Sequence, residues 1–363
     1  MGKREHFLTL DFLRGIAALC VVGHHWFVNA NPGDPIAFGR GPLAVDLFFV
    51  LSGFVIAYSY EERLINGMSP WRFCMLRLIR LYPMILAAIA IGVFRTIVRG
   101  HSNHALAVSS HDLIMAIGAN LVMLPADFSK SVLGDALFPL NLVLWSLFFE
   151  LAANFVYGFC AKFITVLVLN VTVAAGMIWL LWIVVVHHGI AGGWNVPTFF
   201  DGFPRVVFSF FVGVVLFRQR RDFPKFRLPK LASPLLAIWV IASLAGSQSA
   251  DGFEELAMVL VVFPAIVLFG SNDVPSGIMA KIAAFAGEVS YPLYAVHLPL
   301  MYLLIGAMRA AHINANPILL AFPVMAVLAA CSWAVLKLYD EPVRKWFSAK
   351  TRRPVPLAEP AAS

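Results

Sequence analysis

Charged residues are few in this sequence, and their scarcity indicates its class. Asp, Glu, Lys and Arg supply only 13% of the 363 residues, whereas 60% are hydrophobic. This leaves too little polar material to cover the two or three soluble domains that the length would otherwise suggest. The mean hydropathy of +0.82 is typical of a membrane protein. The composition therefore excludes an ordinary cytosolic enzyme.

Cysteine and the common cofactor motifs are also scarce or missing. The four cysteines lie far apart and include no Cys-x-x-Cys pair, so the sequence predicts neither a thiol redox site nor a zinc site. His101, His104 and His111 are close in the chain, but they have no thiolate and only Asp112 beside them. There is no Gly-x-Ser-x-Gly elbow, phosphate-binding loop or dinucleotide fingerprint. We therefore expect no metal and no tightly bound cofactor.

Long hydrophobic runs, by contrast, are abundant. Most are near the roughly 17 to 25 residues that a helix needs to cross a hydrocarbon core of about 30 Å. Ten such windows span residues 7–29, 42–60, 78–98, 138–160, 163–187, 204–217, 231–248, 255–270, 283–307 and 316–338. They are apolar on every side, which excludes an outer-membrane barrel with its alternating strands. We predict an all-α, polytopic transmembrane helical bundle with about ten spans and one short re-entrant or interfacial helix at 112–125. The membrane domain is expected at 1–342 and a short polar tail at 343–363.

The basic residues predict the orientation of these spans. With ten crossings and a cytoplasmic N-terminus, most of the 27 lysines and arginines fall on the cytoplasmic side, including the block at 218–230. The outer side receives Arg40, Arg95, Arg99, Lys130, Arg205 and Arg309. This asymmetry follows the positive-inside rule, so we expect both termini in the cytoplasm. The net charge of +7 then reflects topology and not nucleic-acid binding. Helical spans favour the inner (plasma) membrane.

The first span contains ionisable side chains, which are costly at membrane depth and are candidates for function. Arg14 and His25 are separated by close to three helical turns, so they project from one face about 16 Å apart along the axis. His24 points roughly 100° away and is interpreted as a packing neighbour. His25 is therefore the candidate catalytic histidine of this span, although a buried structural histidine is the alternative.

The second and third spans add further polar positions. Asp46 lies at the outer end of the second span, and Ser52 and Gly53 in its middle allow close approach of a ligand or of another backbone. Arg77 and Arg80 are three residues apart, so they are neighbours on one helix face at the cytoplasmic mouth. Such a pair can bind a phosphate, or it can anchor the helix at the cytoplasmic interface.

The fourth and ninth spans supply the remaining candidates. Glu150 lies in the centre of an otherwise apolar helix, five residues after Trp145, and a carboxylate there needs a partner. A buried Glu can orient a histidine and stabilise its imidazolium form. Tyr291, Tyr294 and His297 lie on a proline-containing helix of the kind that lines cavities, or they anchor that helix at the interface.

Five short motifs occur in order along these spans. They consist of Arg14 and His25; Phe48, Phe49, Ser52, Gly53 and Phe54; Arg77 and Arg80; Trp145, Ser146, Leu147 and Glu150; and Ser290, Tyr291, Tyr294 and His297. Each motif alone is weakly specific, whereas five in this order are jointly specific. Over residues 9 to about 342 the chain resembles the integral-membrane acyltransferase type 3 family, which includes O-antigen, exopolysaccharide and nodulation-factor acetylases.

The resemblance implies transfer of an acyl group, usually acetyl, from cytosolic acyl-CoA to a hydroxyl of a carbohydrate or lipid-linked glycan. Acyl-CoA would be a co-substrate, its phosphates held by Arg77 and Arg80, with Arg14 steering the donor or neutralising a carboxylate. His25 would act as general base or become acylated first, oriented by Glu150 or Asp46. The residues expected to line or support the channel are Ser52, Gly53, Trp145, Tyr291, Tyr294 and His297.

Two other functions use the same residues. A proton-coupled transporter or flippase would use His25, Glu150 and His297 as a proton relay. A structural or sensory membrane protein would bind anionic lipid through its basic loops. Consumption of acyl-CoA distinguishes the enzyme from both alternatives.

Overall fold

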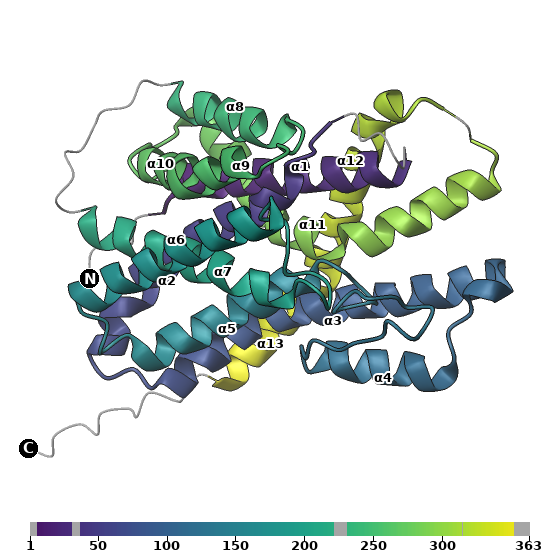
Figure 1. Cartoon of the computed structure of the whole chain (residues 1–363), viewed down its shortest axis with the longest axis horizontal. Helices are drawn as coiled ribbons and strands as arrows, with labels where there is room; N and C mark the ends of the chain where they lie inside the picture. Colours follow the sequence, from purple (N-terminus) through teal and green to yellow (C-terminus); the bar gives the residue numbers. More distant parts are fainter. Residues whose placement is uncertain (1–5, 31–36, 221–230, 314, 352–363) are drawn as a thin grey trace, which may run out of the picture.

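Helices and their connecting turns make up the described part of the chain. The computed structural model describes residues 6–30, 37–220, 231–313 and 315–351, and these ranges contain no β-sheet (Figure 1). Helices suit such an apolar sequence because each satisfies its own backbone hydrogen bonds, which lipid cannot do. The structure thus confirms the all-α prediction.

Every apolar window of the sequence coincides with a helix or with a series of short helical segments. The helices are α1 (Leu8–Ala30), α2 (Ala44–Ile65), α3 (Pro70–Ser102), α4 (Ser110–Leu121), α5 (Leu144–Cys160), α6 (Val166–His187), α7 (Gly202–Gln219), α8 (Ala232–Ala245), α9 (Phe253–Ala257), α10 (Phe263–Gly270), α11 (Gly277–Ala310), α12 (Pro317–Val335) and α13 (Glu341–Thr351). A π-helical turn joins α9 to α10, and another joins α12 to α13. α3 begins earlier than the predicted 78–98 because Pro70 starts it, a position where proline is favoured.

Several of these helices are long and apolar enough to cross a membrane. Seven such segments occur in the described residues: Gly41–Ile65, Pro70–Ser102, Val166–His187, Phe199–Gln219, Phe253–Gly270, Gly277–Ala310 and Pro317–Lys350. α5 and α8 are apolar but shorter, with 17 and 14 residues. The protein is therefore a helical membrane protein, and its crossing number of ten and its orientation remain predictions.

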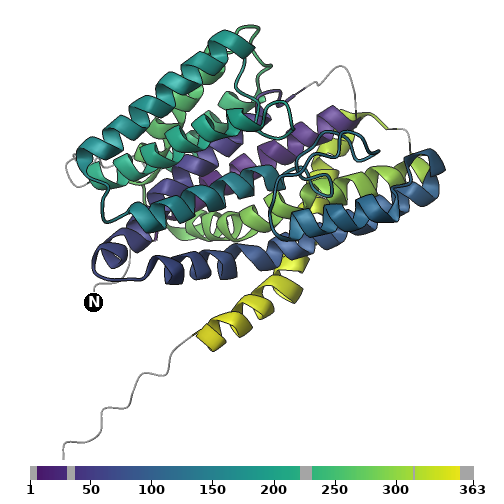
Figure 2. The ribbon, with the colours of Figure 1, turned by 60° about the horizontal axis from the view of Figure 1, so that its bottom comes forward.

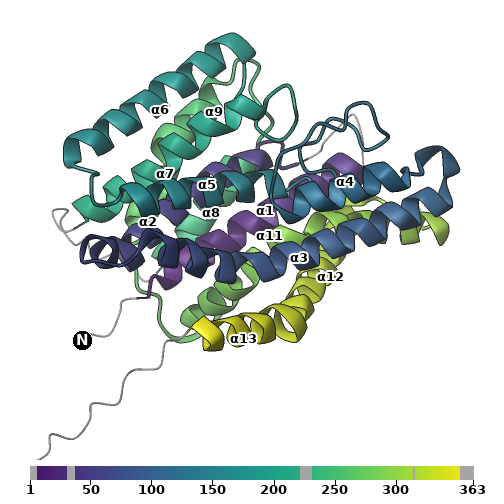
Figure 3. The same ribbon diagram turned by 90° about the horizontal axis from the view of Figure 1, so that it is seen from below.

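The arrangement of the helices brings distant parts of the sequence together. α1 and α11 run side by side through the middle of the bundle (Figure 1, Figure 3). α3 packs on α11, α2 packs on α7, and α6 covers α7 on the far face (Figure 3). The N-terminal half of α11 therefore meets residues of α1, α2, α3 and α5 around one cavity.

Two glycines bring α2 and α7 into close contact. A Cβ atom added at Gly53 would collide with the backbone carbonyl of Phe210, and one added at Gly213 would collide with the carbonyl of Val50. Small residues at such positions let two helix backbones approach closely. Of the two possibilities for Gly53, the structure therefore shows approach of a helix backbone.

The short window and the tail complete the comparison with the predicted spans. α4 covers most of the predicted 112–125 segment, and its 12 residues extend about 18 Å, too short to cross a bilayer. The first part of the predicted polar tail is helical, because α13 continues to Thr351 and projects away from the bundle (Figure 2). Eight basic residues that entered the orientation prediction lie outside the described residues: Lys3, Arg4, Arg221, Lys225, Arg227, Lys230, Arg352 and Arg353.

Candidate functional site

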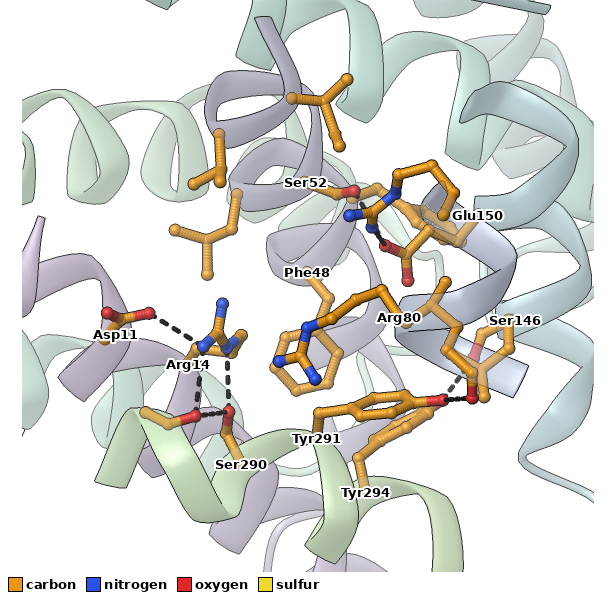
Figure 4. Close-up of a pocket in the computed structure, with 18 of the residues that line it drawn as sticks. Asp11, Arg14, Phe48, Ser52, Arg80, Ser146, Glu150, Ser290, Tyr291 and Tyr294 are labelled. Atoms are coloured by element: carbon orange, nitrogen blue, oxygen red, sulfur yellow. Dashed lines mark hydrogen bonds and ion pairs between the residues drawn. The ribbon is translucent and has the colours of Figure 1, made fainter. Parts of the chain in front are cut away.

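A cavity of about 550 Å³ lies among α1, α2, α3, α5 and α11 (Figure 4). Ligand pockets in proteins typically measure roughly 300 to 1,000 Å³. The cavity brings together seven of the candidate residues from separate spans: Arg14, Ser52, Arg77, Arg80, Glu150, Tyr291 and Tyr294. Its lining also includes His6 and Asp11 at the start of α1, so it extends to the end of the bundle that is predicted to be cytoplasmic.

The three arginines of the cavity differ in their partners. Arg14 is held by the carboxylate of Asp11 at 2.8 Å and donates from Nε to the hydroxyl of Ser290 at 2.8 Å. Arg77 lies 3.6 Å from Glu150, and its buried Nε has no hydrogen-bond partner in the described residues. Arg80 extends into the cavity with its guanidinium 5.7 Å from the ring centre of Tyr291, and no described carboxylate forms an ion pair with it (Figure 4). The cavity thus presents guanidinium groups with unused donor capacity.

Glu150 is bound within this cavity. Ser52 donates its hydroxyl hydrogen to Glu150 Oε1 at 2.9 Å, and Arg77 approaches the same oxygen. The serine of the second span therefore lines the cavity, whereas its neighbour Gly53 packs against α7. No hydrogen bond joins Glu150 to a histidine in the described residues.

Asp46 belongs to a separate, closed ion pair. It lies 2.6 Å from Arg205, and both side chains are completely buried. Arg205 also donates to the backbone carbonyls of Gly192 and Pro42, at 2.8 and 3.0 Å, and stacks over the ring of Trp145 at 5.1 Å. Asp46 and Trp145 therefore support the fold beside the cavity and do not line it.

His25 is paired with another histidine. Nε2 of His297 lies 3.0 Å from Nδ1 of His25. This corrects the expectation that Glu150 or Asp46 orients His25: both carboxylates are bound by arginines, and His297 occupies the place next to the imidazole. α1 and α11 pack side by side, which brings the two rings together.

The hydrogen-bond network fixes where the protons of this pair lie. Nδ1 of His297 faces the carbonyl oxygens of Leu293 and Tyr294 at 3.0 and 2.8 Å, so this nitrogen carries a hydrogen. In a neutral ring Nε2 of His297 is then an acceptor. Nδ1 of His25 faces that acceptor and the carbonyl of Val21 at 3.1 Å, so it must be the donor. The lone pair of neutral His25 therefore lies on Nε2, where a base or nucleophile needs it.

Pro299 interrupts the backbone hydrogen bonds of α11 close to His297. Pro299 has no amide hydrogen, so the carbonyl of Ala295 loses its helical partner. Asn141 donates its side-chain amide to that carbonyl at 2.7 Å and links the turn before α5 to α11. A neighbouring side chain thus replaces the backbone donor that proline lacks, which is one way in which membrane helices tolerate proline.

Two side chains separate the cavity from the histidine pair. Tyr294 lines the cavity and lies with its ring centre 6.1 Å from that of His297, while neither His25 nor His297 lines the cavity. The Tyr294 hydroxyl and the Ser146 hydroxyl are 2.5 Å apart, and Phe48 packs edge-on against Tyr294 (Figure 4). The cavity thus ends at Phe48 and Tyr294, one side-chain layer short of the histidines.

Some residues of this arrangement were not predicted from sequence. Arg205 was predicted only as an outer basic residue, and no role was predicted for Asn141. A signal for Arg205 existed, because an arginine beside an apolar helix needs a counter-charge and Asp46 was the outer carboxylate in a facing span. Asn141 had a weaker signal in Pro299, which leaves one carbonyl in need of a donor.

Comparison with known proteins identifies the class to which this helical membrane protein with an arginine-lined cavity belongs. The acyltransferase domain matches residues 7–337, so the chain belongs to the acyltransferase type 3 family and is a membrane acyltransferase. "Protein 2 in picA locus" of Rhizobium radiobacter is 39% identical over 167 residues, which cover 42% of this chain and 82% of that relative. No solved structure matches the chain.

Proposed function

We propose that this protein transfers an acyl group, acetyl in the first instance, from acyl-CoA to a hydroxyl of a carbohydrate or glycoconjugate acceptor. The enzyme acts in the inner (plasma) membrane, with the donor entering from the cytoplasm and the acceptor from the outer side. One observation carries the proposal: beyond an arginine-lined cavity, His25 is held by His297 with its Nε2 lone pair available.

The cavity suits the donor because it combines cationic and apolar groups. Guanidinium groups bind phosphate oxygens through paired hydrogen bonds, and the side chains of Arg77 and Arg80 both line the cavity. The apolar side chains of Phe48 and Leu81 line the same space and suit the pantetheine arm. Exclusion of water protects the thioester from hydrolysis.

Transfer uses the lone pair of His25 in one of two ways. As a general base, Nε2 takes the proton of the acceptor hydroxyl while the hydroxyl oxygen attacks the thioester carbonyl. The carbon–sulfur bond then breaks, and the leaving thiolate takes the proton from Nε2. As a nucleophile, Nε2 attacks the thioester carbonyl, the carbon–sulfur bond breaks and the CoA thiolate leaves; the acceptor oxygen then attacks the acyl group on Nε2, the nitrogen–acyl bond breaks, and the hydroxyl proton neutralises the thiolate. The first path requires a ternary complex, and the second gives ping-pong kinetics, so initial-rate kinetics with both substrates varied decide between them.

His297 is a positioning residue in both paths. It accepts a hydrogen bond from Nδ1 of His25 and thereby fixes the tautomer that exposes Nε2. It also receives part of the positive charge when His25 gains a proton. Among the described residues, no carboxylate contacts the imidazole of His25. A proton relay for transport would need a contact between the histidine pair and Glu150, and the described residues contain none.

The proposal is tested by mass spectrometry of envelope and secreted glycans, together with acyl-CoA consumption in membranes. Cells carry the wild type, His25→Ala or His24→Ala, matched for protein abundance in the membrane. His24 is the matched control because it packs edge-on against His25, with ring centres 5.2 Å apart, but its hydrogen bond joins the backbone carbonyl of Phe38 at 2.8 Å and not His297. We expect an added acyl mass with the wild type and His24→Ala, and none with His25→Ala. Equal acylation in cells with and without the wild-type protein contradicts the proposal.

A further inference from the structure

Six basic residues are assigned to the outer side: the exposed Lys130 and five arginines, and the arginines fall into two groups. Arg205 is neutralised by Asp46, and Arg40 forms ion pairs with Glu254 and Glu255. Three arginines, Arg95, Arg99 and Arg309, form no ion pair with any carboxylate in the described residues. Outer loops carry few basic residues under the positive-inside rule, so unneutralised arginines there call for an explanation.

These three arginines gather where α3 and α11 end. The guanidinium of Arg95 lies 4.3 Å from the ring centre of Tyr302, which joins the two helices. Arg99 follows Arg95 by four residues, so the two like charges are neighbours on one face, an arrangement that destabilises an isolated helix. Arg309 lies about two turns beyond Tyr302 on the same side of α11. The helix ends therefore concentrate positive charge, and no carboxylate of the described residues forms an ion pair with it.

A second cavity lies next to the C-terminal end of α11 and to the part of α1 that follows His25. It has a volume of about 170 Å³ and is lined by Arg309, Trp26 and Asn29, among other residues of α1, α11 and α12. Asn29 donates its side-chain amide to the backbone carbonyl of His25 at 2.7 Å. The donor cavity contacts α1 near Arg14, and this cavity contacts α1 beyond His25, so His25 lies between them along the helix.

We propose that the cavity at Asn29 and Arg309 forms part of the acceptor site, and that Arg309, together with Arg95 and Arg99 outside the cavity lining, holds a carboxylate or phosphate of the acceptor. This inference rests on the proposed function and specifies its substrate class. Guanidinium groups match the geometry of both anions through paired hydrogen bonds. The anion belongs either to an acidic sugar of the glycan or to the phosphate of a lipid-linked one, and both supply the same charge.

The test uses the full-length protein in membrane vesicles and a glycan pool from cells that lack its gene. One part of the pool is untreated, one has its carboxylates reduced to alcohols, and one is dephosphorylated. Transfer from labelled acetyl-CoA is measured for each part. We expect transfer to the untreated pool and at least a tenfold lower rate to one treated pool; loss on reduction identifies a sugar carboxylate, and loss on dephosphorylation identifies a phosphate. Equal rates with all three pools overturn the inference.

Variants locate the anion on the protein. Arg95→Gln with Arg99→Gln, and separately Arg309→Gln, should each raise the KM for the untreated pool about tenfold or more and leave the KM for acetyl-CoA unchanged. Lys130→Gln is the matched control, because Lys130 is an exposed outer cation away from this cavity. Lysine at positions 95 and 99 should restore part of the affinity. Unchanged acceptor KM in both arginine variants overturns the inference.

The same assay separates this inference from the proposed function. One outcome is thioester consumption that depends on His25 but equal transfer to the untreated and the treated pools. This outcome supports the proposed function and refutes the anionic acceptor. The absence of any transfer or thioester consumption that depends on His25 refutes the proposed function, and the acceptor site with it.

Discussion

The molecule buries arginines in two settings that differ in how far their donors are satisfied. Arg205 has Asp46, two backbone carbonyls and the face of Trp145 around it, and its side chain is completely buried. Arg77 and Arg80 line a cavity, and the Nε of Arg77 has no partner in the described residues. A buried charge is tolerated when it is paired and hydrogen-bonded. We call an arginine saturated when its hydrogen-bond donors are satisfied within the protein, and such an arginine supports the fold. An arginine that lines a cavity and has unsatisfied donors is available to a ligand.

The largest effect should follow removal of the saturated arginine. Arg205→Ala leaves Asp46 buried without a counter-charge, and breaking such a pair costs about 3–5 kcal/mol. We expect a strongly lowered melting temperature in detergent and low abundance in the membrane. The double variant with Asp46→Asn should recover part of that loss because no charge is left unpaired. Full stability of Arg205→Ala would remove the contrast between the two settings.

Removal of the unsaturated arginines should affect the donor and not the fold. Hydrogen bonds to charged groups contribute roughly 1.5–3 kcal/mol, so Arg80→Gln should raise the KM for acyl-CoA by about tenfold to a hundredfold. Arg77→Gln should act in the same direction, with a smaller effect because the charge of Arg77 is already partly neutralised by Glu150. Steady-state kinetics and thermal unfolding are measured on the same preparations. A large loss of stability in Arg80→Gln would place it with Arg205.

The histidine pair offers an intermediate case, in which a buried group acts through its neighbour. His297→Ala should lower kcat by about tenfold, or roughly 1.4 kcal/mol, because His25 loses the acceptor that fixes its tautomer. His297→Gln should retain more activity, since its carbonyl oxygen can accept the same hydrogen bond. The KM for acyl-CoA should change little in either variant. Equal kcat in the Ala and Gln variants would show that His297 serves packing alone.

The smallest effect concerns the side-chain layer between the cavity and the histidines. Tyr294→Phe keeps the ring and removes the hydrogen bond to Ser146, at a cost of about 0.5–1.5 kcal/mol. We expect slightly lower thermal stability together with faster hydrolysis of acyl-CoA in the absence of acceptor, because the layer is loosened. Ser146→Ala removes the same bond from the other side and should give a similar result. Opposite results in the two variants would show that the hydrogen bond between Ser146 and Tyr294 does not hold this layer together.

Local patterns in the sequence were enough to predict much of this protein. The spacing of Arg14 and His25 placed both on one face of the first helix, and both in fact contact α11, through Ser290 and His297 respectively. The apolar windows predicted the helices because hydrophobicity and backbone self-satisfaction act within one segment. The motif order predicted the family, and the family match agrees.

The pairing of charges could not be predicted in the same way. Asp46 was one of the two carboxylates, with Glu150, that were expected to orient His25, yet its partner Arg205 lies 159 residues further along the chain. Which charges meet depends on how α2 and α7 are rotated and how closely they pack, and that is set by Gly53 and Gly213 acting together. The same holds for His25, whose partner His297 is brought to it by the packing of α1 on α11.

The sequence by itself therefore determined a helical membrane protein, its apolar segments and the polar residues that such segments carry at a cost. The tertiary structure alone decided which of those residues share a cavity, which arginine is saturated, and which nitrogen of His25 bears the lone pair. The physical reason is that hydrophobicity and helix formation are properties of contiguous residues. Hydrogen bonds and ion pairs between spans, in contrast, depend on distances of a few ångström that exist only after the helices have packed.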